Sequence, residues 1–134
     1  MRIFKTKWFA RFARREGVTD KSLLEAIERA EQGLIDADLG EGLIKLRIAR
    51  PGAGRSGGYR TIVAYRGAHR AIFLYAFAKS EREIVGPDEI VSFRRAGGYW
   101  LSVDAMKIKE GLANGAIQEV DDGQKGQSYR RSNS

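Results

Sequence analysis

The chain has 134 residues, a net charge of +7 and no cysteine, which excludes disulfides and thiolate chemistry. This length predicts one domain with a buried core. The charged N-terminal stretch lacks the apolar run of a secretory signal, and no stretch approaches the roughly 20 apolar residues that span a bilayer. We therefore expect a cytoplasmic protein; a membrane-surface or transit helix at the Arg-rich start is the less favoured alternative.

The first third of the chain predicts a strand, two helices and a loop. The strand is expected at residues 2–5. The first helix should span 9–15 and stop at Gly17, and the second should begin after Thr19 or Asp20 and stop at Gly33. The loop is expected at 36–42. The helical assignments follow from apolar residues at helical spacing and from the capping residues beside them.

The middle third predicts a meander of three strands, which favours antiparallel pairing. The strands are expected at 43–49, 59–66 and 71–77. The first two alternate between apolar and polar residues, whereas the third is nearly all apolar, as in a strand buried on both faces. The glycine-rich residues 51–58 predict a turn or mobile loop between them.

The last third predicts two helices, a short strand and a tail. One helix should begin near Pro87 and end at Gly97-Gly98, and Ser102 should cap another over 103–113. A short strand is expected at 116–120. The polar composition from residue 121 to 134 predicts a disordered tail, so the domain should comprise residues 1–120.

All of the excess positive charge lies in residues 42–80. This segment contains eight basic residues and no acidic one, whereas the rest of the chain has 16 basic and 17 acidic residues. Such a concentrated positive field suits a polyanion, and nucleic acid is the commonest polyanion.

Three basic residues on the first two central strands predict an anion site: Lys45, Arg47 and Arg60. Lys45 and Arg47 share one strand face, and a hairpin brings Arg60 close to them. The alternative is an ordinary solvated face, neutralised by acids of the second helix: Glu25, Glu28 and Glu31.

Other chemistries fit the sequence less well. Residues 52–57 match the glycine pattern of a dinucleotide site, but a strand rather than a helix is expected to follow. These residues are either a simple linker or a phosphate-contacting loop with Arg55 and Ser56. His69, the only histidine, is expected at an exposed turn, and neither a metal site nor a catalytic triad is expected. Tyr59 and Tyr65 could stack on bases, although strand aromatics more often belong to the core.

Three segments together resemble the RelE/HigB-like toxins of type II toxin–antitoxin systems: residues 43–47, 54–60 and 73–79, which read LIKLR, GRSGGYR and FLYAFAK. Residues 101–120 also resemble the C-terminal part of one branch of this family. The resemblance covers about residues 1–120. It implies an α+β fold with two N-terminal helices packed on a small antiparallel sheet, followed by C-terminal helices.

The resemblance also implies a ribosome-dependent mRNA endonuclease that uses neither metal nor cofactor and cuts at the codon in the A site. Active-site positions are implied for Lys45, Arg47, Arg60 and Lys79. The arginines would stabilise a phosphorane-like transition state, Lys45 is the candidate base, and Lys79 or Arg60 could assist the leaving oxygen. RNA contacts are expected from the rest of the basic block, through Arg50, Arg55, Ser56, Tyr59 and Arg66.

The implied partners are the ribosome with its rRNA and mRNA, and a cognate antitoxin that often carries a helix-turn-helix. Operator DNA would be bound only through that antitoxin, and no membrane partner is expected. Two alternatives stay open. One is a gyrase-inhibiting relative, against which the clustered basic residues argue. The other is a non-catalytic RNA-binding module, because Leu43 and Ser80 stand where RelE has Lys and Arg, and the Tyr that RelE has near Val85 is absent.

Overall fold

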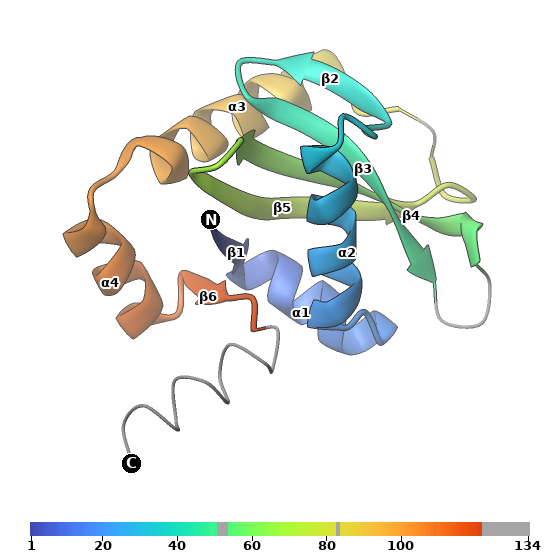
Figure 1. The fold of residues 1–134 in the computed structure, drawn as a ribbon. Helices are drawn as coiled ribbons and strands as arrows, with labels where there is room; N and C mark the ends of the chain where they lie inside the picture. Colours follow the sequence, from blue (N-terminus) through green and yellow to red (C-terminus); the bar gives the residue numbers. More distant parts are fainter. Residues whose placement is uncertain (51–53, 83, 122–134) are drawn as a thin grey trace.

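The structure is a computed structural model that describes residues 1–50, 54–82 and 84–121 (Figure 1). Its elements in chain order are β1 (Arg2–Thr6), α1 (Lys7–Glu16), α2 (Asp20–Glu31), β2 (Ala37–Gly40), β3 (Leu43–Arg50), β4 (Gly54–Arg66), β5 (Arg70–Ala78), α3 (Pro87–Ser102), α4 (Ala105–Asn114) and β6 (Ile117–Glu119). Of the predicted tail, residues 122–134 lie outside the described part of the chain.

The six strands form one sheet in the order β2-β3-β4-β5-β1-β6. The predicted meander β3-β4-β5 is confirmed, with antiparallel pairing throughout. The expectation of a wholly antiparallel sheet was wrong, because β1 pairs in parallel with β5, with Arg2 opposite Arg70. The sheet of this α+β fold is therefore mixed. Local sequence does not reveal this pairing, which joins segments nearly 70 residues apart.

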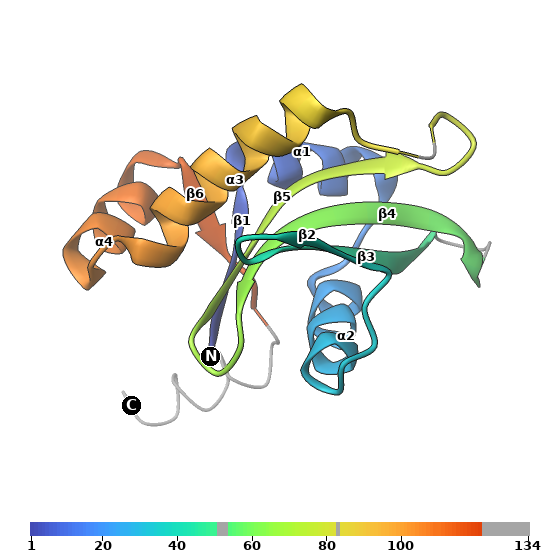
Figure 2. The same cartoon turned by 90° about the horizontal axis from the view of Figure 1, so that it is seen from above.

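Helices pack on both faces of the sheet, as Figure 2 shows for α2 and α3. One core cluster joins α1 and α2 to the sheet and includes Phe9, Phe12, Leu23, Ile27, Ile44, Leu46, Ile48, Tyr59 and Phe73. The other joins α3 and α4 to the opposite face and includes Phe4, Leu43, Ile62, Ile72, Phe77, Leu101 and Ile108. Within the described residues, no helix combines the length and apolar character that crossing a bilayer requires.

Two predicted loops are partly strand. The segment expected as a loop at 36–42 contains β2, which pairs with the start of β3 through a tight turn. The glycine-rich segment belongs to β4 from Gly54 onward, and residues 51–53 lie outside the described part. Gly58 explains why a strand can form here: a Cβ at this position would lie 2.0 Å from the backbone oxygen of Ile48. The glycine therefore permits a close approach of two strands.

The boundaries of the two helices in the N-terminal part of the chain were predicted well, and those of the two C-terminal helices less well. Thr19 caps α2 by accepting a hydrogen bond from the Ser22 amide, and Gly17 ends α1 in the left-handed conformation. In contrast, α3 continues through Gly97 to Ser102, and Asp104 rather than Ser102 caps α4. The Ser102 hydroxyl instead donates to backbone oxygens in the last turn of α3.

Candidate active site

Three basic side chains converge on the sheet face that α3 covers: Lys45, Arg47 and Arg60, the cation cluster. Leu46 is buried in the core on the α2 side, so its neighbours Lys45 and Arg47 project from the other face of β3. Arg60 lies directly opposite Arg47 on β4, and residues opposed in this way share a face. The predicted convergence of these three residues is thus present.

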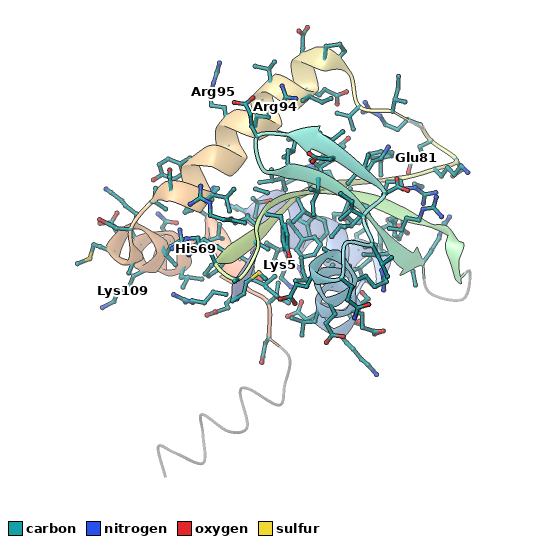
Figure 3. The ribbon with its side chains drawn as sticks, turned by 45° about the horizontal axis from the view of Figure 1, so that its top comes forward. Lys5, His69, Glu81, Arg94, Arg95 and Lys109 are labelled. Carbon is teal, nitrogen blue, oxygen red and sulfur yellow. The ribbon has the colours of Figure 1, made fainter. Side chains whose placement is uncertain are left out.

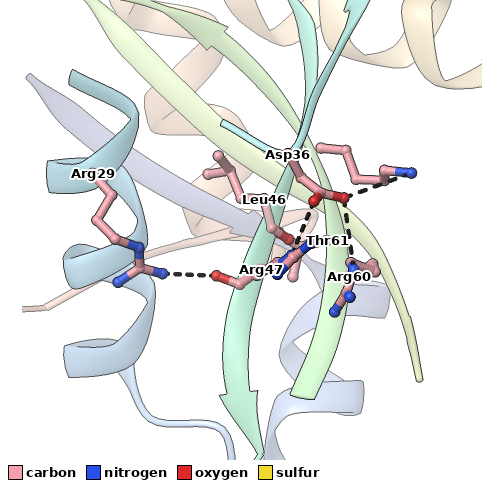
Figure 4. Close-up of polar contacts among 7 residues, drawn as sticks. Arg29, Asp36, Leu46, Arg47, Arg60 and Thr61 are labelled. Atoms are coloured by element: carbon pink, nitrogen blue, oxygen red, sulfur yellow. Dashed lines mark hydrogen bonds and ion pairs between the residues drawn. The ribbon is translucent and has the colours of Figure 1, made fainter. Parts of the chain in front are cut away.

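The cation cluster surrounds one carboxylate, that of Asp36, which immediately precedes β2 (Figure 4). Its Oδ1 accepts a hydrogen bond of 2.9 Å from Arg47 Nε. Its Oδ2 lies 3.7 Å from Lys45 Nζ and 3.6 Å from Arg60 Nε. The alternative that helix α2 supplies the neutralising acids was wrong, because the acid comes from the α2–β2 connection.

One carboxylate neutralises only part of this cluster. Three positive charges and one negative charge leave an excess of two positive charges at the site. Arg60 is only 6% exposed, and its Nη1 has no hydrogen-bond partner within the described residues. A buried guanidinium nitrogen without an acceptor is unfavourable, so this arrangement favours an additional anionic ligand.

The cluster opens towards solvent at Arg47, whose side chain is 51% exposed. Beside it is a surface pocket of about 630 Å³, lined by Arg29, Leu34, Ile35, Asp36, Leu46 and Arg47. Arg29 of α2 donates to the backbone oxygen of Arg47 at 2.8 Å and so fixes α2 against β3. The anion site is therefore accessible at one end and closed at Arg60.

Lys79 directly follows β5 and is exposed. Phe77, two residues earlier, pairs with Arg60 across the strands, so Lys79 lies at the same end of the sheet as the cation cluster. Within the described part of the chain, its side chain makes no hydrogen bond or ion pair. The structure thus brings Lys79 near the cluster without joining it to Asp36.

Tyr59, predicted to contact RNA, belongs to the core. It is 2% exposed, packs edge-on against Phe12, and donates a 2.5 Å hydrogen bond to Glu16. Burial raises the pKa of Tyr59, and the hydrogen bond from Tyr59 lowers the pKa of Glu16. The prediction that this ring contacts RNA was wrong, because neither ring face is free. Arg50 lies over the same ring at 5.7 Å and is exposed.

The remaining predicted RNA contacts are dispersed. Arg66 lies at the far end of β4 from the cluster and donates to the backbone oxygen of Leu101 at the end of α3. The side chains of Arg55 and Ser56 lie outside the described part of the structure. His69 occupies the exposed turn between β4 and β5, as predicted (Figure 3). Tyr65 is partly buried against the first core cluster.

Sequence reasoning missed Asp36 and Arg82. Asp36 precedes the acid-free segment and was assigned to a loop, but Gly40-Glu41-Gly42 is a turn signal that folds it back beside Lys45. Arg82 lies over the ring of Phe77 at 5.4 Å and binds Glu89 with two hydrogen bonds. The hydrogen bonds from Arg82 lower the pKa of Glu89, and a hydrogen bond from the Gly86 amide lowers it further.

The family model of the RelE toxin of the RelE/RelB toxin–antitoxin system matches residues 1–120 of the chain. A search among curated proteins found no match. The family match spans every helix and strand described above, including the cation cluster on β3 and β4. The chain therefore belongs to the RelE toxin family.

Proposed function

We propose that this chain is the toxin of a toxin–antitoxin pair and that it cleaves mRNA on the ribosome, in the cytoplasm, without a metal ion. The observation that carries the proposal is the cation cluster, with its two excess positive charges and the Nη1 of Arg60, for which no described residue is a partner. A phosphodiester supplies the anionic oxygens that this cluster lacks.

The reaction is a transesterification within the RNA strand. The 2′-oxygen forms a bond to the adjacent phosphorus, and the bond from phosphorus to the 5′-oxygen of the next nucleotide breaks. The 2′-hydroxyl loses its proton to a base, and the leaving 5′-oxygen gains one from an acid. The products are a 2′,3′-cyclic phosphate and a free 5′-hydroxyl. The phosphorus passes through a state with an extra negative charge, which nearby cations stabilise.

We assign the phosphate oxygens to Arg47 and Arg60. Arg60 is fixed by burial and Arg47 lies at the open end, so together they can hold a phosphate in a defined orientation. Lys45, with 18% of its side chain exposed, is our candidate for the base. Lys79 is exposed at the same end of the sheet and is assigned to the leaving oxygen or a flanking phosphate.

The partners follow from the same proposal. The basic surface would contact rRNA and mRNA phosphates on the ribosome, with Arg50, Arg55 and Ser56 as further contacts. A cognate antitoxin would neutralise the toxin, and the pair would reach operator DNA through a helix-turn-helix of the antitoxin.

The test is inducible expression of the wild type and variants in cells, with mapping of RNA 5′ ends. We expect growth arrest with cuts inside translated codons for the wild type, and neither for Arg60→Ala. Because Arg60 is buried, Arg47→Ala is the second variant: Arg47 is half-exposed, so its loss spares the core. Arg95→Ala is the matched control, since Arg95 is an exposed arginine of α3 away from the cluster (Figure 3).

The outcomes separate the candidate functions. Cuts that persist in Arg95→Ala and vanish in both cluster variants support the nuclease. Arrest without codon-level cuts contradicts it and points to another target such as gyrase. Soluble protein that causes neither arrest nor cuts contradicts it too, and leaves a non-catalytic RNA-binding module.

A further inference from the structure

Asp36 occupies the position at which the cation cluster would hold a phosphate. Its two oxygens are shared among three cationic groups, at 2.9, 3.7 and 3.6 Å. No other carboxylate within the described residues is paired with any of the three. The protein therefore carries its own anion in the anion site.

We propose that Asp36 is a built-in competitor for the substrate phosphate: it holds the three cations together in the free protein and weakens phosphate binding until its carboxylate is displaced. The identity of the incoming anion as an RNA phosphate rests on the proposed function. The competition itself rests only on the contacts of Asp36 with the cation cluster.

The carboxylate holds its cations incompletely. Only the contact with Arg47 is a hydrogen bond, whereas the contacts with Lys45 and Arg60 are longer ion pairs. A carboxylate offers two oxygens in one plane, and a phosphate offers more acceptors in a tetrahedral arrangement. Arg60 Nη1 is buried and Asp36 leaves it without a partner, so a phosphate would have to take the place of the carboxylate to bind it.

Asp36 also has room to move. Its amide donates to the Lys45 backbone oxygen at 2.8 Å, so its backbone is tied to β3. Asp36 is, however, one of the residues that line the pocket of about 630 Å³ beside the cluster, with the exposed Leu34, and its side chain is 15% exposed. Rotation of the short side chain can take the carboxylate out of the cluster without disturbing the sheet. If the carboxylate stays, it repels the incoming phosphate at close range.

The experiment compares the binding of inorganic phosphate by the wild type, Asp36→Asn and Asp38→Asn, followed by NMR of the arginine Nε–H groups. Asp38 is the matched control: it lies two residues away, is exposed, and among the described residues accepts only from the Gly40 amide, at 2.9 Å. Both variants lose the same charge. We expect Asp36→Asn to bind phosphate about tenfold more tightly than the wild type, because it loses a charge in direct contact with the cluster. Asp38→Asn should change affinity by less than about twofold.

Equal or weaker binding by Asp36→Asn would overturn the proposal, because a purely structural aspartate predicts a loss of affinity. Should Asp36→Asn not fold, the wild type answers the question through the carboxyl ¹³C signal of Asp36. Phosphate must shift this signal and that of Arg47 Nε–H; if neither shifts while phosphate binds, the proposal is wrong. Neither measurement uses RNA cleavage, so an inactive wild type whose Asp36→Asn variant gains phosphate affinity contradicts only the proposed function.

Discussion

Gly97 of α3 lies directly against Ala64 of β4, so closely that a Cβ at position 97 would be 2.7 Å from the Cβ of Ala64. A contact this short requires the helix to move away from the sheet. We therefore expect Gly97→Ala to lower the free energy of unfolding by about 1–3 kcal/mol, measured by urea denaturation.

Gly98 is the control for this substitution, since it is the next residue of the same helix and a Cβ there would meet no atom within 4 Å. Alanine favours the helix over glycine, so Gly98→Ala should keep or raise the stability, by up to about 1 kcal/mol. Equal destabilisation by both variants would show that Gly97 is not packed as described.

Gly58 is the corresponding position in the sheet. A Cβ there would lie 2.0 Å from the Ile48 backbone oxygen, and Arg60 is two residues further along the same strand. We expect Gly58→Ala to cost about 3 kcal/mol or more in the free energy of unfolding and to abolish the proposed RNA cleavage, because β3 and β4 can no longer approach. Urea denaturation and 5′-end mapping measure the two effects.

Gly67→Ala is the matched variant for Gly58→Ala. Gly67 lies in the turn after β4, where a Cβ would meet its nearest atom, the Tyr65 hydroxyl oxygen, at an ordinary 3.5 Å. The free energy of unfolding of Gly67→Ala should differ from that of the wild type by less than about 1 kcal/mol, and this variant should retain the proposed RNA cleavage. A Gly58→Ala variant that behaves like Gly67→Ala would contradict the close strand approach.

These glycines show where local sequence signals stop being sufficient. The sequence predicted the helices near the N-terminus because periodicity and capping residues are local properties. It predicted that α3 ends at Gly97-Gly98 because glycine disfavours helices, and a segment 51–58 without regular structure for the same reason. In both places the glycine leaves room for a close contact with a distant segment: Gly97 with Ala64, and Gly58 with Ile48. Such contacts override local propensity.

The hydrogen bond between Tyr59 and Glu16 makes stability depend on pH. Because this bond lowers the folded-state pKa of Glu16 below its ordinary value of 4.5, it stabilises the protein above that pH and is lost as the pH falls through the folded-state pKa. Tyr59→Phe should therefore be less stable than the wild type at neutral pH, with the difference shrinking in acid. Urea midpoints across this range measure it.

At the alkaline end the sign reverses. Burial raises the pKa of Tyr59 above its ordinary value of 10.0, so the contribution of Tyr59 to stability is complete below that pH and is lost as the pH rises further.

Tyr65→Phe is the control for the acid experiment, since the Tyr65 hydroxyl makes no hydrogen bond within the described residues. If Tyr65→Phe changes the acid response as much as Tyr59→Phe, the Glu16 bond is not its cause.

The sequence predicted the three cations of the candidate site but not the carboxylate that they share. Strand alternation and the hairpin were enough to bring Lys45, Arg47 and Arg60 together. The composition of residues 42–80 concealed their counter-ion, because Asp36 lies outside that segment and reaches it only through the β2–β3 turn. Tyr59 was misplaced for a related reason: alternation separates the two faces of a strand but does not say where on each face the helices pack, and Tyr59 lies in the core cluster with α1 and α2.

Lys79 provides a test of how far the proposed RNA site extends beyond the cation cluster. It is exposed beyond the end of β5 and carries a charge that no described side chain neutralises. If it contacts an RNA phosphate, Lys79→Ala should weaken binding of a 2′-O-methylated, uncleavable RNA oligonucleotide. It should also reduce the slope of log affinity against log salt by about 0.7, as expected for one phosphate contact on a single strand.

Lys109→Ala is the control for Lys79→Ala, because it removes the same charge from an exposed position on α4 (Figure 3) and should leave that slope unchanged. Identical slopes for both variants would restrict the phosphate contacts to residues other than Lys79.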